Sequence, residues 1–169
     1  AGAGVGFAAV GARPKRDAVS FASARAHALS KRALTMAASS VFFWATSAWV
    51  PAMAADTRHA TLGAMVSCNT YRNPDLLADM ARTVDHLSDG RLSLGLGSGW
   101  FERDYGEYGY PFATGPERQA ALVESLKRIA ARLAKLNPPP IGPMPIMLGA
   151  SGERVGLRIV AEFGDAWNT

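Results

Sequence analysis

Three short runs of small and polar residues, each following a predicted β-strand, could hold a ligand. They are residues 67–70 (SCNT), 97–99 (GSG) and 149–152 (GASG). Their hydroxyl, amide and thiol groups can form hydrogen bonds, and their glycines allow a ligand to approach the backbone closely. Because ligands bind outside the carboxyl ends of parallel strands, the three runs are expected to lie side by side in one site.

The third run has the chemistry of an anion site. Gly149, Ala150, Ser151 and Gly152 stand between a predicted strand and a predicted helix. Backbone N–H groups at a helix N-terminus, the helix dipole and a serine hydroxyl together attract an anionic group such as phosphate. The alternative is that Ser151 only caps the helix. The sequence leaves both interpretations open.

The second run has glycines in the spacing of a dinucleotide-binding loop. That alternative predicts a helix directly after Gly99. The following residues (WFERDYGEYG) show no amphipathic period, and we expect residues 97–112 to be irregular. In the first run, Cys68 is expected to be a small buried residue rather than a nucleophile, because no partner base is evident.

Other function classes are not expected. The net charge of +4 arises in residues 1–55, which carry six basic residues and one acidic residue, and no RNA-binding signature is present. No nucleic-acid partner is therefore predicted. Serine, threonine and Pro51 interrupt the apolar run 34–50, so no membrane span is predicted. His27, His59 and His86 lack metal-ligand spacing, and no metal site is predicted.

The cellular compartment has two interpretations. One cysteine excludes an intramolecular disulfide framework and favours a reducing, cytoplasmic location. The pair Lys31 and Arg32 before an apolar stretch, with A-x-A spacing after Pro51, also has the layout of a secretory signal peptide. Thirty residues precede that pair, and cleavage would remove a strand that the fold needs, so we expect the cytoplasm.

The elements that position the three runs alternate between helix and strand. Five helices are predicted, at residues 21–33, 48–55, 74–90, about 114–136 and 151–163. Pro51 would lie in the first turn of the second helix. Asn73 caps the third helix, which has Pro74 at its first position and ends at Gly90, and Thr114 and Glu117 form a capping box at the start of the fourth. Strands are predicted at 39–44, 61–68, 91–96, 146–148 and 165–168, with an extended proline-rich connector at 137–145. Leu76, Leu77, Met80, Val84 and Leu87 form the predicted apolar stripe of one helix. This alternation indicates a parallel α/β sheet.

The chain resembles a known family over two long stretches. SCNTYRNPDLLADMARTVDHLSDGRLSLGLGSGWFERDYGEYGYPF and NPPPIGPMPIMLGASGERVGLRIVAEFGDAWN are similar to the luciferase-like monooxygenase family, which includes flavin-dependent enzymes and oxidoreductases that use the deazaflavin coenzyme F420. The resemblance implies a (β/α)₈ TIM barrel. A complete barrel needs roughly 250 residues. We therefore expect a poorly ordered segment 1–20 and an incomplete barrel at 21–169, with five or six of the eight βα units.

The resemblance also implies roles for individual residues. A non-proline cis peptide at Cys68–Asn69 would buttress the cofactor ring, and residues 149–152 would hold the cofactor phosphate. Trp44, Trp100 and Glu102 are assigned to the substrate pocket, and no residue is assigned to catalysis. Two alternatives stay open: Trp100 as an ordinary core aromatic residue, and Glu102 paired with Arg103 at the surface. The implied cofactor-binding residues are Cys68, Asn69, Thr70, Gly97, Ser98, Gly99, Gly149, Ala150, Ser151, Gly152, Trp167 and Asn168.

The function expected from the resemblance is hydride transfer between a small organic substrate and coenzyme F420, with FMN as the alternative cofactor. Two features favour a different function, a truncated and non-catalytic barrel fragment. The Asp-His pair that commonly follows the family's second strand is missing after Trp44, and strands of the barrel are missing. Exposed sheet edges would then allow pairing with another copy of the chain as a homo-oligomer.

Overall fold

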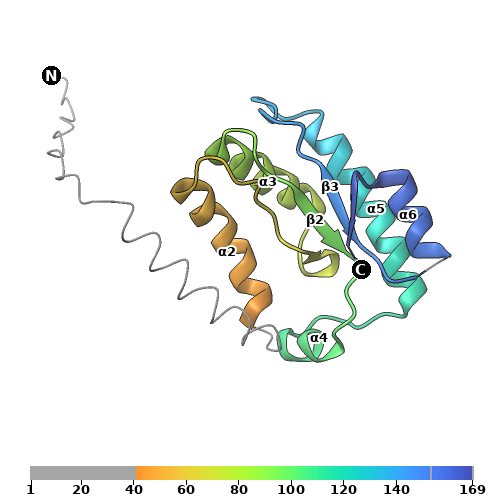
Figure 1. The fold of residues 1–169 in the computed structure, drawn as a ribbon. Helices are drawn as coiled ribbons and strands as arrows, with labels where there is room; N and C mark the ends of the chain where they lie inside the picture. Colours follow the sequence, from red (N-terminus) through yellow and green to blue (C-terminus); the bar gives the residue numbers. More distant parts are fainter. Residues whose placement is uncertain (1–40, 153, 169) are drawn as a thin grey trace, which may run out of the picture. The chain divides into compact units, whose positions relative to one another are not determined.

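The computed structural model describes residues 41–152 and 154–168, which form a parallel sheet with helices packed against it (Figure 1). The expectations for residues 1–20, the helix at 21–33 and the boundary between them lie outside the described residues. The elements are α2 (Val41–Asp56), β1 (Ser67–Cys68), η1 (Asn69–Tyr71), α3 (Pro74–Ser88), β2 (Leu94–Gly97), α4 (Glu102–Tyr108), α5 (Gly115–Leu133), β3 (Ile146–Gly149), α6 (Val155–Phe163) and β4 (Ala166–Asn168).

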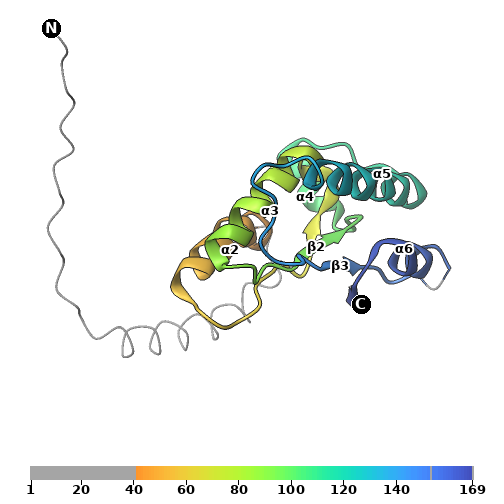
Figure 2. The ribbon, with the colours of Figure 1, turned by 90° about the horizontal axis from the view of Figure 1, so that it is seen from above.

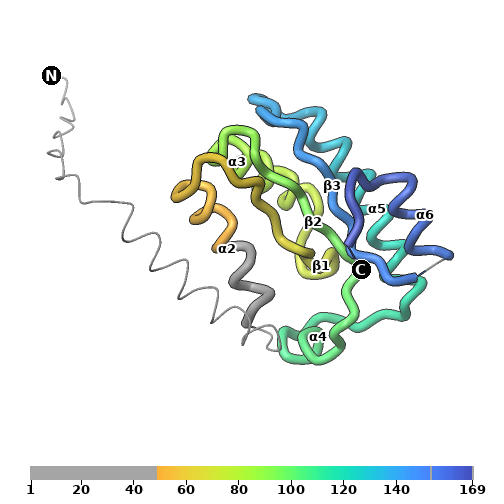
Figure 3. Tube along the Cα trace, in the orientation of Figure 1, coloured from red at the N-terminus to blue at the C-terminus, as the bar shows by residue number. Residues whose placement is uncertain are grey.

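The sheet has four parallel strands in the order β1-β2-β3-β4, as the tube in Figure 3 shows for the first three. Strand order therefore follows chain order throughout the described residues. A dinucleotide-binding sheet reverses its strand order at the ligand site. The consecutive order instead matches part of a TIM barrel, which confirms the predicted fold class. Helix α4 begins three residues after Gly99, close to where the dinucleotide-binding alternative predicted a helix, so the strand order is what argues against that alternative.

The two faces of the sheet differ. Leu94, Leu96 and Leu148 point into a core shared with the helices, and α3 and α5 lie along the same side of β2 and β3 (Figure 2). The partners from α5 are Leu122, Leu126 and Ile129. Successive residues of a strand point to opposite faces. The intervening residues of β2 and β3, including Gly95, Gly97 and Gly149, therefore face away from the helices.

Both ends of α3 are as predicted. The Asn73 side chain accepts hydrogen bonds from the N–H groups of Asp75 (2.9 Å) and Leu76 (3.2 Å), and Pro74 is the first helical residue. At the other end, Gly90 adopts a left-handed conformation with φ of 76°. Asp89, with φ of 58°, does the same and ends the helix. Capping residues therefore specified this helix locally.

The predicted apolar stripe of α3 is wrong in part. Leu77 is buried and Val84 packs against the core, but Leu76, Met80 and Leu87 are 56%, 40% and 55% exposed. The small residues Ala78 and Ala81 occupy the buried face instead. Small side chains allow α3 to pack closely on its neighbours, so the helix turns its larger apolar residues outward.

Several element boundaries also differ from the predictions. Residues 41–44 belong to helix α2 rather than to a strand, and Pro51 lies inside that helix. A short apolar run cannot be assigned by periodicity, and the helix-forming residues that follow favour helix here. The predicted strand at 61–68 is reduced to β1 and an isolated bridge between Leu62 and Leu92. Residues 97–112, predicted irregular, contain α4. Within the described residues, no helix has the length and apolar character needed to cross a membrane.

Candidate cofactor site at the carboxyl end of the sheet

Four of the predicted cofactor-binding residues lie in one row across the sheet. In the observed register Cys68 pairs with Gly97, Gly97 with Gly149, and Gly149 with Asn168. Each is the last residue of its strand. The three runs of small and polar residues therefore emerge from the same edge of the sheet, as the sequence predicted.

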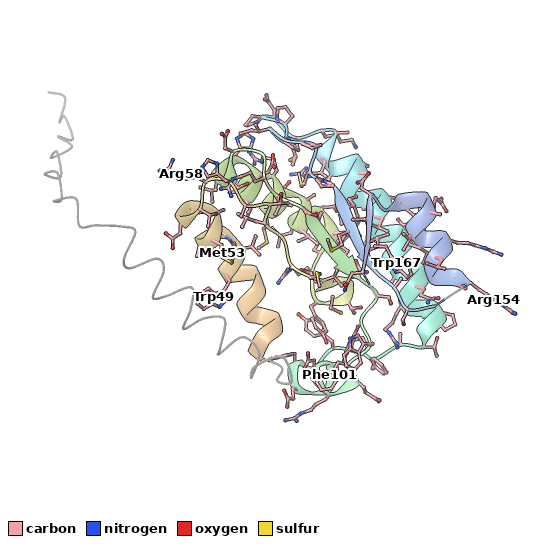
Figure 4. The ribbon with its side chains drawn as sticks, viewed as in Figure 1. Trp49, Met53, Arg58, Phe101, Arg154 and Trp167 are labelled. Carbon is pink, nitrogen blue, oxygen red and sulfur yellow. The ribbon has the colours of Figure 1, made fainter. Side chains whose placement is uncertain are left out.

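Hydrogen bonds connect the third run to the last strand. The Ala150 N–H donates to the Asn168 carbonyl (3.1 Å), and the Trp167 indole Nε1–H donates to the Ala150 carbonyl (2.8 Å). The Trp167 side chain is 51% exposed and is labelled in Figure 4. Ala150, Trp167 and Asn168, all predicted site residues, are thus brought together. Their role in binding stays a prediction.

The side chain of Val66 lies over the glycines on the open face of the sheet. A Cβ added to Gly97 would lie 2.8 Å from Val66 Cγ2, and one added to Gly149 would lie 2.5 Å from the same atom. The sequence interpretation assigned the close approach at Gly97 to the cofactor ring and assigned Gly149 to the cofactor phosphate. In the structure their missing side chains make room for Val66, a residue that the sequence did not single out.

The predicted position of the cis peptide is wrong. The non-proline cis bond joins Met65 to Val66 rather than Cys68 to Asn69. A second cis bond joins Asn137 to Pro138 in the proline-rich connector. Asn69 instead begins the 3₁₀ turn η1 and is buried, whereas Thr70, the next residue, is half-buried.

A buried tyrosine connects the first two runs. Tyr105, on α4, is 1% exposed, and its hydroxyl donates to Thr70 Oγ1 (3.2 Å). The same hydroxyl lies 3.2 Å from Cys68 Sγ. A Cβ on Gly99 would lie only 2.1 Å from that hydroxyl, and Gly99 has φ of 80°. Glycine is therefore required at position 99 both by its backbone conformation and by the tyrosine.

Burial determines how the groups around Tyr105 ionise. Desolvation, with a contribution from Cys68, raises the pKa of Tyr105 to about 12. Desolvation also raises the pKa of the neighbouring Tyr71, again with a contribution from Cys68. Both phenols are therefore protonated near neutral pH and can donate hydrogen bonds. Cys68 keeps its predicted role as a small buried residue.

Asp104 is a buried acid beside this group. It is 6% exposed, and its Oδ1 atom has no hydrogen-bond partner among the described residues. Desolvation and, to a smaller extent, Glu107 raise the pKa of Asp104, while Arg103 acts in the opposite direction. A buried carboxyl oxygen without a partner is costly for a folded protein, and such groups are concentrated at functional sites.

The third run is open to solvent and differs in detail from the prediction. Ser151 and Gly152 are exposed, and helix α6 begins at Val155 without a side-chain cap. The predicted capping of this helix by Ser151 is therefore wrong. The Leu157 N–H donates to the Gly152 carbonyl (3.1 Å). Arg154 extends away from the molecule (Figure 4).

Two of the predicted substrate-pocket residues, Trp100 and Glu102, lie at the surface. Trp100 is 81% exposed and its ring centroid lies 5.3 Å from that of Phe101, so Trp100 is not a core residue. Glu102 is also exposed, and Arg103 pairs with Glu107 (2.8 Å) instead of with Glu102. Trp44 lies on α2, and its side chain is outside the described part of the structure. Substrate contact stays a prediction for all three.

Sequence reasoning missed Val66, Tyr105 and Asp104. The last two belong to an aromatic and charged segment that was predicted to be irregular, so no helical position was assigned to them. A buried tyrosine one residue from a buried acid becomes visible only once α4 is recognised. Among the described residues, no group of three or more histidine, cysteine, aspartate or glutamate side chains could hold a metal ion.

The sequence of this chain is similar to those of known proteins. The family model for luciferase-like monooxygenases matches residues 29–169. An F420-dependent glucose-6-phosphate dehydrogenase of Amycolatopsis mediterranei is 32% identical, with 73% of this chain and 42% of the relative covered. A pyrimidine monooxygenase of Allorhizobium ampelinum is 28% identical, with 67% and 35% covered.

A solved structure has a fold similar to that of this chain. An F420-dependent secondary alcohol dehydrogenase, in complex with an F420–acetone adduct, superposes with a TM-score of 0.63 at 19% identity, covering 72% of this chain and 42% of that one. The chain thus spans less than half the length of these three proteins. From the family match over most of its residues, the chain belongs to the luciferase-like monooxygenase family.

Proposed function

We propose that the chain binds a deazaflavin or flavin cofactor at the carboxyl end of β1–β4, with coenzyme F420 favoured over FMN. The observation that carries this proposal is the row formed by Cys68, Gly97, Gly149 and Asn168 at one edge of the sheet. Two of the similar proteins named above are F420-dependent, which supports the choice of cofactor.

The residues present fit such a cofactor. Val66 and the 69%-exposed Met65 offer an apolar surface on the open face of the sheet, suited to one side of a planar ring. At the far end of the row, the exposed Ser151 and Gly152 precede the start of α6, where backbone N–H groups and the helix dipole favour a phosphate. The site thus has an apolar part and an anion-binding part.

In the proposed reaction a hydride passes between a small organic substrate and the cofactor. When bound, the cofactor supplies the ring carbon or nitrogen that gains or loses the hydride. Asn69 and Thr70 would hydrogen-bond the ring edge and fix its orientation. Trp100 and Glu102, exposed beyond the second run, would contact the substrate.

Titration with each cofactor tests this proposal directly. We expect saturable quenching of coenzyme F420 fluorescence by the wild-type chain, and weaker binding of FMN. Gly152→Glu should weaken binding at least tenfold, because a negative charge at the phosphate end repels the ligand. Gly115→Glu is the matched control, since it adds the same charge at the exposed first turn of α5. Failure of the wild-type chain to bind either cofactor would contradict the proposal.

A second candidate is a non-catalytic piece that acts through assembly. It is favoured by the outer positions of β1 and β4 in the four-stranded sheet and by the exposed Trp167 on β4. Unpaired strand edges pair readily with other chains. This candidate predicts a concentration-dependent homo-oligomer in size-exclusion chromatography with light scattering. A monomer at all concentrations that binds cofactor would exclude it.

A further inference from the structure

Tyr105 fills the space between the first two turns of the candidate site. Its ring makes edge contacts with Tyr71 and Phe112, with centroids 4.9 Å away in both cases. Packing therefore holds the ring, and the hydroxyl sits at a fixed point. That point lies beside both Cys68, the last residue of β1, and Gly99, which follows β2.

The hydrogen bond from this hydroxyl to Thr70 sets the role of the threonine. A tyrosine hydroxyl has a single hydrogen, and in the structure it is donated to Thr70 Oγ1 (3.2 Å). The same hydroxyl lies 3.2 Å from Cys68 Sγ, a contact in which either atom could be the donor. Since the Thr70 oxygen accepts from Tyr105, the hydrogen of Thr70 is left to donate elsewhere. Hydrogen bonds arranged in such a chain strengthen one another.

A second interaction holds the Gly99 turn. Arg118, at the start of α5, donates from Nε to the Gly99 carbonyl (3.0 Å), and its guanidinium lies 4.1 Å from the centre of the Phe112 ring. Phe112 in turn packs on Tyr105. Tyr105 and Arg118 thus both contact the second turn, and Tyr105 also contacts the first.

From this arrangement we infer that Tyr105 is a positioning residue, which orients Thr70 as a hydrogen-bond donor toward the cofactor. The inference rests on the proposed function. Its chemical consequence is that the ligand must present an acceptor, such as a ring carbonyl or ring nitrogen, to Thr70. The pyrimidine edge of a deazaflavin or flavin carries acceptors of this kind.

The test compares four variants with the wild-type chain in the cofactor titration. Tyr105→Phe keeps the ring and its packing and removes only the hydroxyl, and we expect about tenfold weaker binding, the effect of one hydrogen bond. Thr70→Ser should bind nearly as the wild type, and Thr70→Val should lose as much as Tyr105→Phe. Tyr110→Phe is the matched control, because Tyr110 belongs to the same aromatic group but donates to the Tyr71 carbonyl (3.3 Å).

Thiol reactivity gives an independent readout of the same geometry. Cys68 is the single cysteine of the chain, so alkylation by iodoacetamide reports on this site alone. Loss of the Tyr105 hydroxyl should accelerate alkylation several-fold, whereas Tyr110→Phe should not. Urea unfolding of each variant shows whether the fold persists.

The outcomes separate the inference from the proposed function. The inference would be overturned if Tyr105→Phe bound the cofactor as tightly as the wild-type chain, or if Tyr110→Phe lost as much affinity as Tyr105→Phe. Either result would leave the proposed function intact. Absence of wild-type binding would overturn both. Unchanged alkylation of Cys68 in Tyr105→Phe would also overturn the inference, whatever the titration shows.

Discussion

The two ends of the sheet use their polar side chains differently. At the amino end, the Arg91 guanidinium donates to the carbonyls of Ser88 (2.6 Å), Ala54, Thr57 and Ala60 and to the Thr57 hydroxyl, which ties the end of α2 to the start of β2. At the carboxyl end, polar side chains contact one another, and exposed residues such as Ser151 and Gly152 follow the strands. The first arrangement is suited to stability and the second to binding.

A second clamp at the amino end shows the same pattern. The carboxylate of Asp85, which is fully buried, accepts through Oδ2 from the N–H groups of Ile141 (2.7 Å) and Gly142 (3.0 Å). The neighbouring His86 contacts the Pro139 carbonyl through Nε2 (2.8 Å). The proline-rich connector before β3 is therefore fixed to α3. In TIM barrels, too, the amino end of the strands serves stability and the carboxyl end serves function.

Arg91→Ala should have the largest effect on stability. It removes five hydrogen bonds and leaves several partly buried carbonyls without their donor. We expect a loss of about 4 kcal/mol in the free energy of unfolding, measured by urea denaturation. Arg103→Ala, which breaks only the exposed ion pair with Glu107, should change it by less than about 0.5 kcal/mol. Equal effects of the two substitutions would refute the structural role given to the amino end.

Gly99→Ala should rank second, and it probes the carboxyl end. The added Cβ would meet the Tyr105 hydroxyl at 2.1 Å in a backbone with φ of 80°. We expect a cost of about 3 kcal/mol, the sum of conformational strain and overpacking. Gly109→Ala separates conformational strain from overpacking, because Gly109 has φ of 72° but no atom within 4 Å of an added Cβ. Its cost should be only about 1 kcal/mol.

Asp85→Ala should destabilise the fold by about 2 kcal/mol, since two backbone N–H groups of the connector lose their acceptor. Cofactor affinity should stay within twofold of wild type, because the substitution lies at the amino end. Glu124→Ala, at an exposed position of α5, is the control and should change the free energy of unfolding by less than about 0.5 kcal/mol. A large loss of affinity in Asp85→Ala would show that the two ends are coupled.

Asp104→Asn should have the smallest effect, and the size of that effect should depend on pH. Burial raises the pKa of this carboxyl, so the folded state binds a proton more tightly than the unfolded state. The stabilising contribution is complete below the unfolded-state pKa and is lost as pH rises through the folded-state value. The wild-type chain should therefore lose stability relative to Asp104→Asn between acidic and neutral pH. A difference in melting temperature between the two chains that stays the same at all pH values would contradict this assignment.

Sequence reasoning succeeded where local chemistry determines the structure. Asn73, Pro74 and Gly90 delimit α3 through capping and backbone preference alone, and the small residues after the strands identify the correct edge of the sheet. The same reasoning placed Cys68, Gly97 and Gly149 at one edge of the sheet, and the family resemblance added Asn168; the register of the strands puts all four in one row.

Sequence reasoning failed where tertiary packing determines the position of a side chain. Leu76, Met80 and Leu87 have helical spacing but lie on the outer face of α3, because Ala78 and Ala81 allow closer packing on the sheet. The glycines at 97 and 149 accommodate the chain's own Val66, which no local pattern reveals. Similarly, Tyr105 acquires its position from a contact with Gly99 that depends on the fold.

The most direct test of the central claim is a backbone amide NMR titration with coenzyme F420. Binding at the carboxyl end predicts chemical-shift changes concentrated in residues 67–70, 97–99 and 149–152. Amides at the amino end, including those of Arg91, Ile141 and Gly142, should stay unchanged. Changes confined to the amino end, or none at saturating cofactor, would contradict the account.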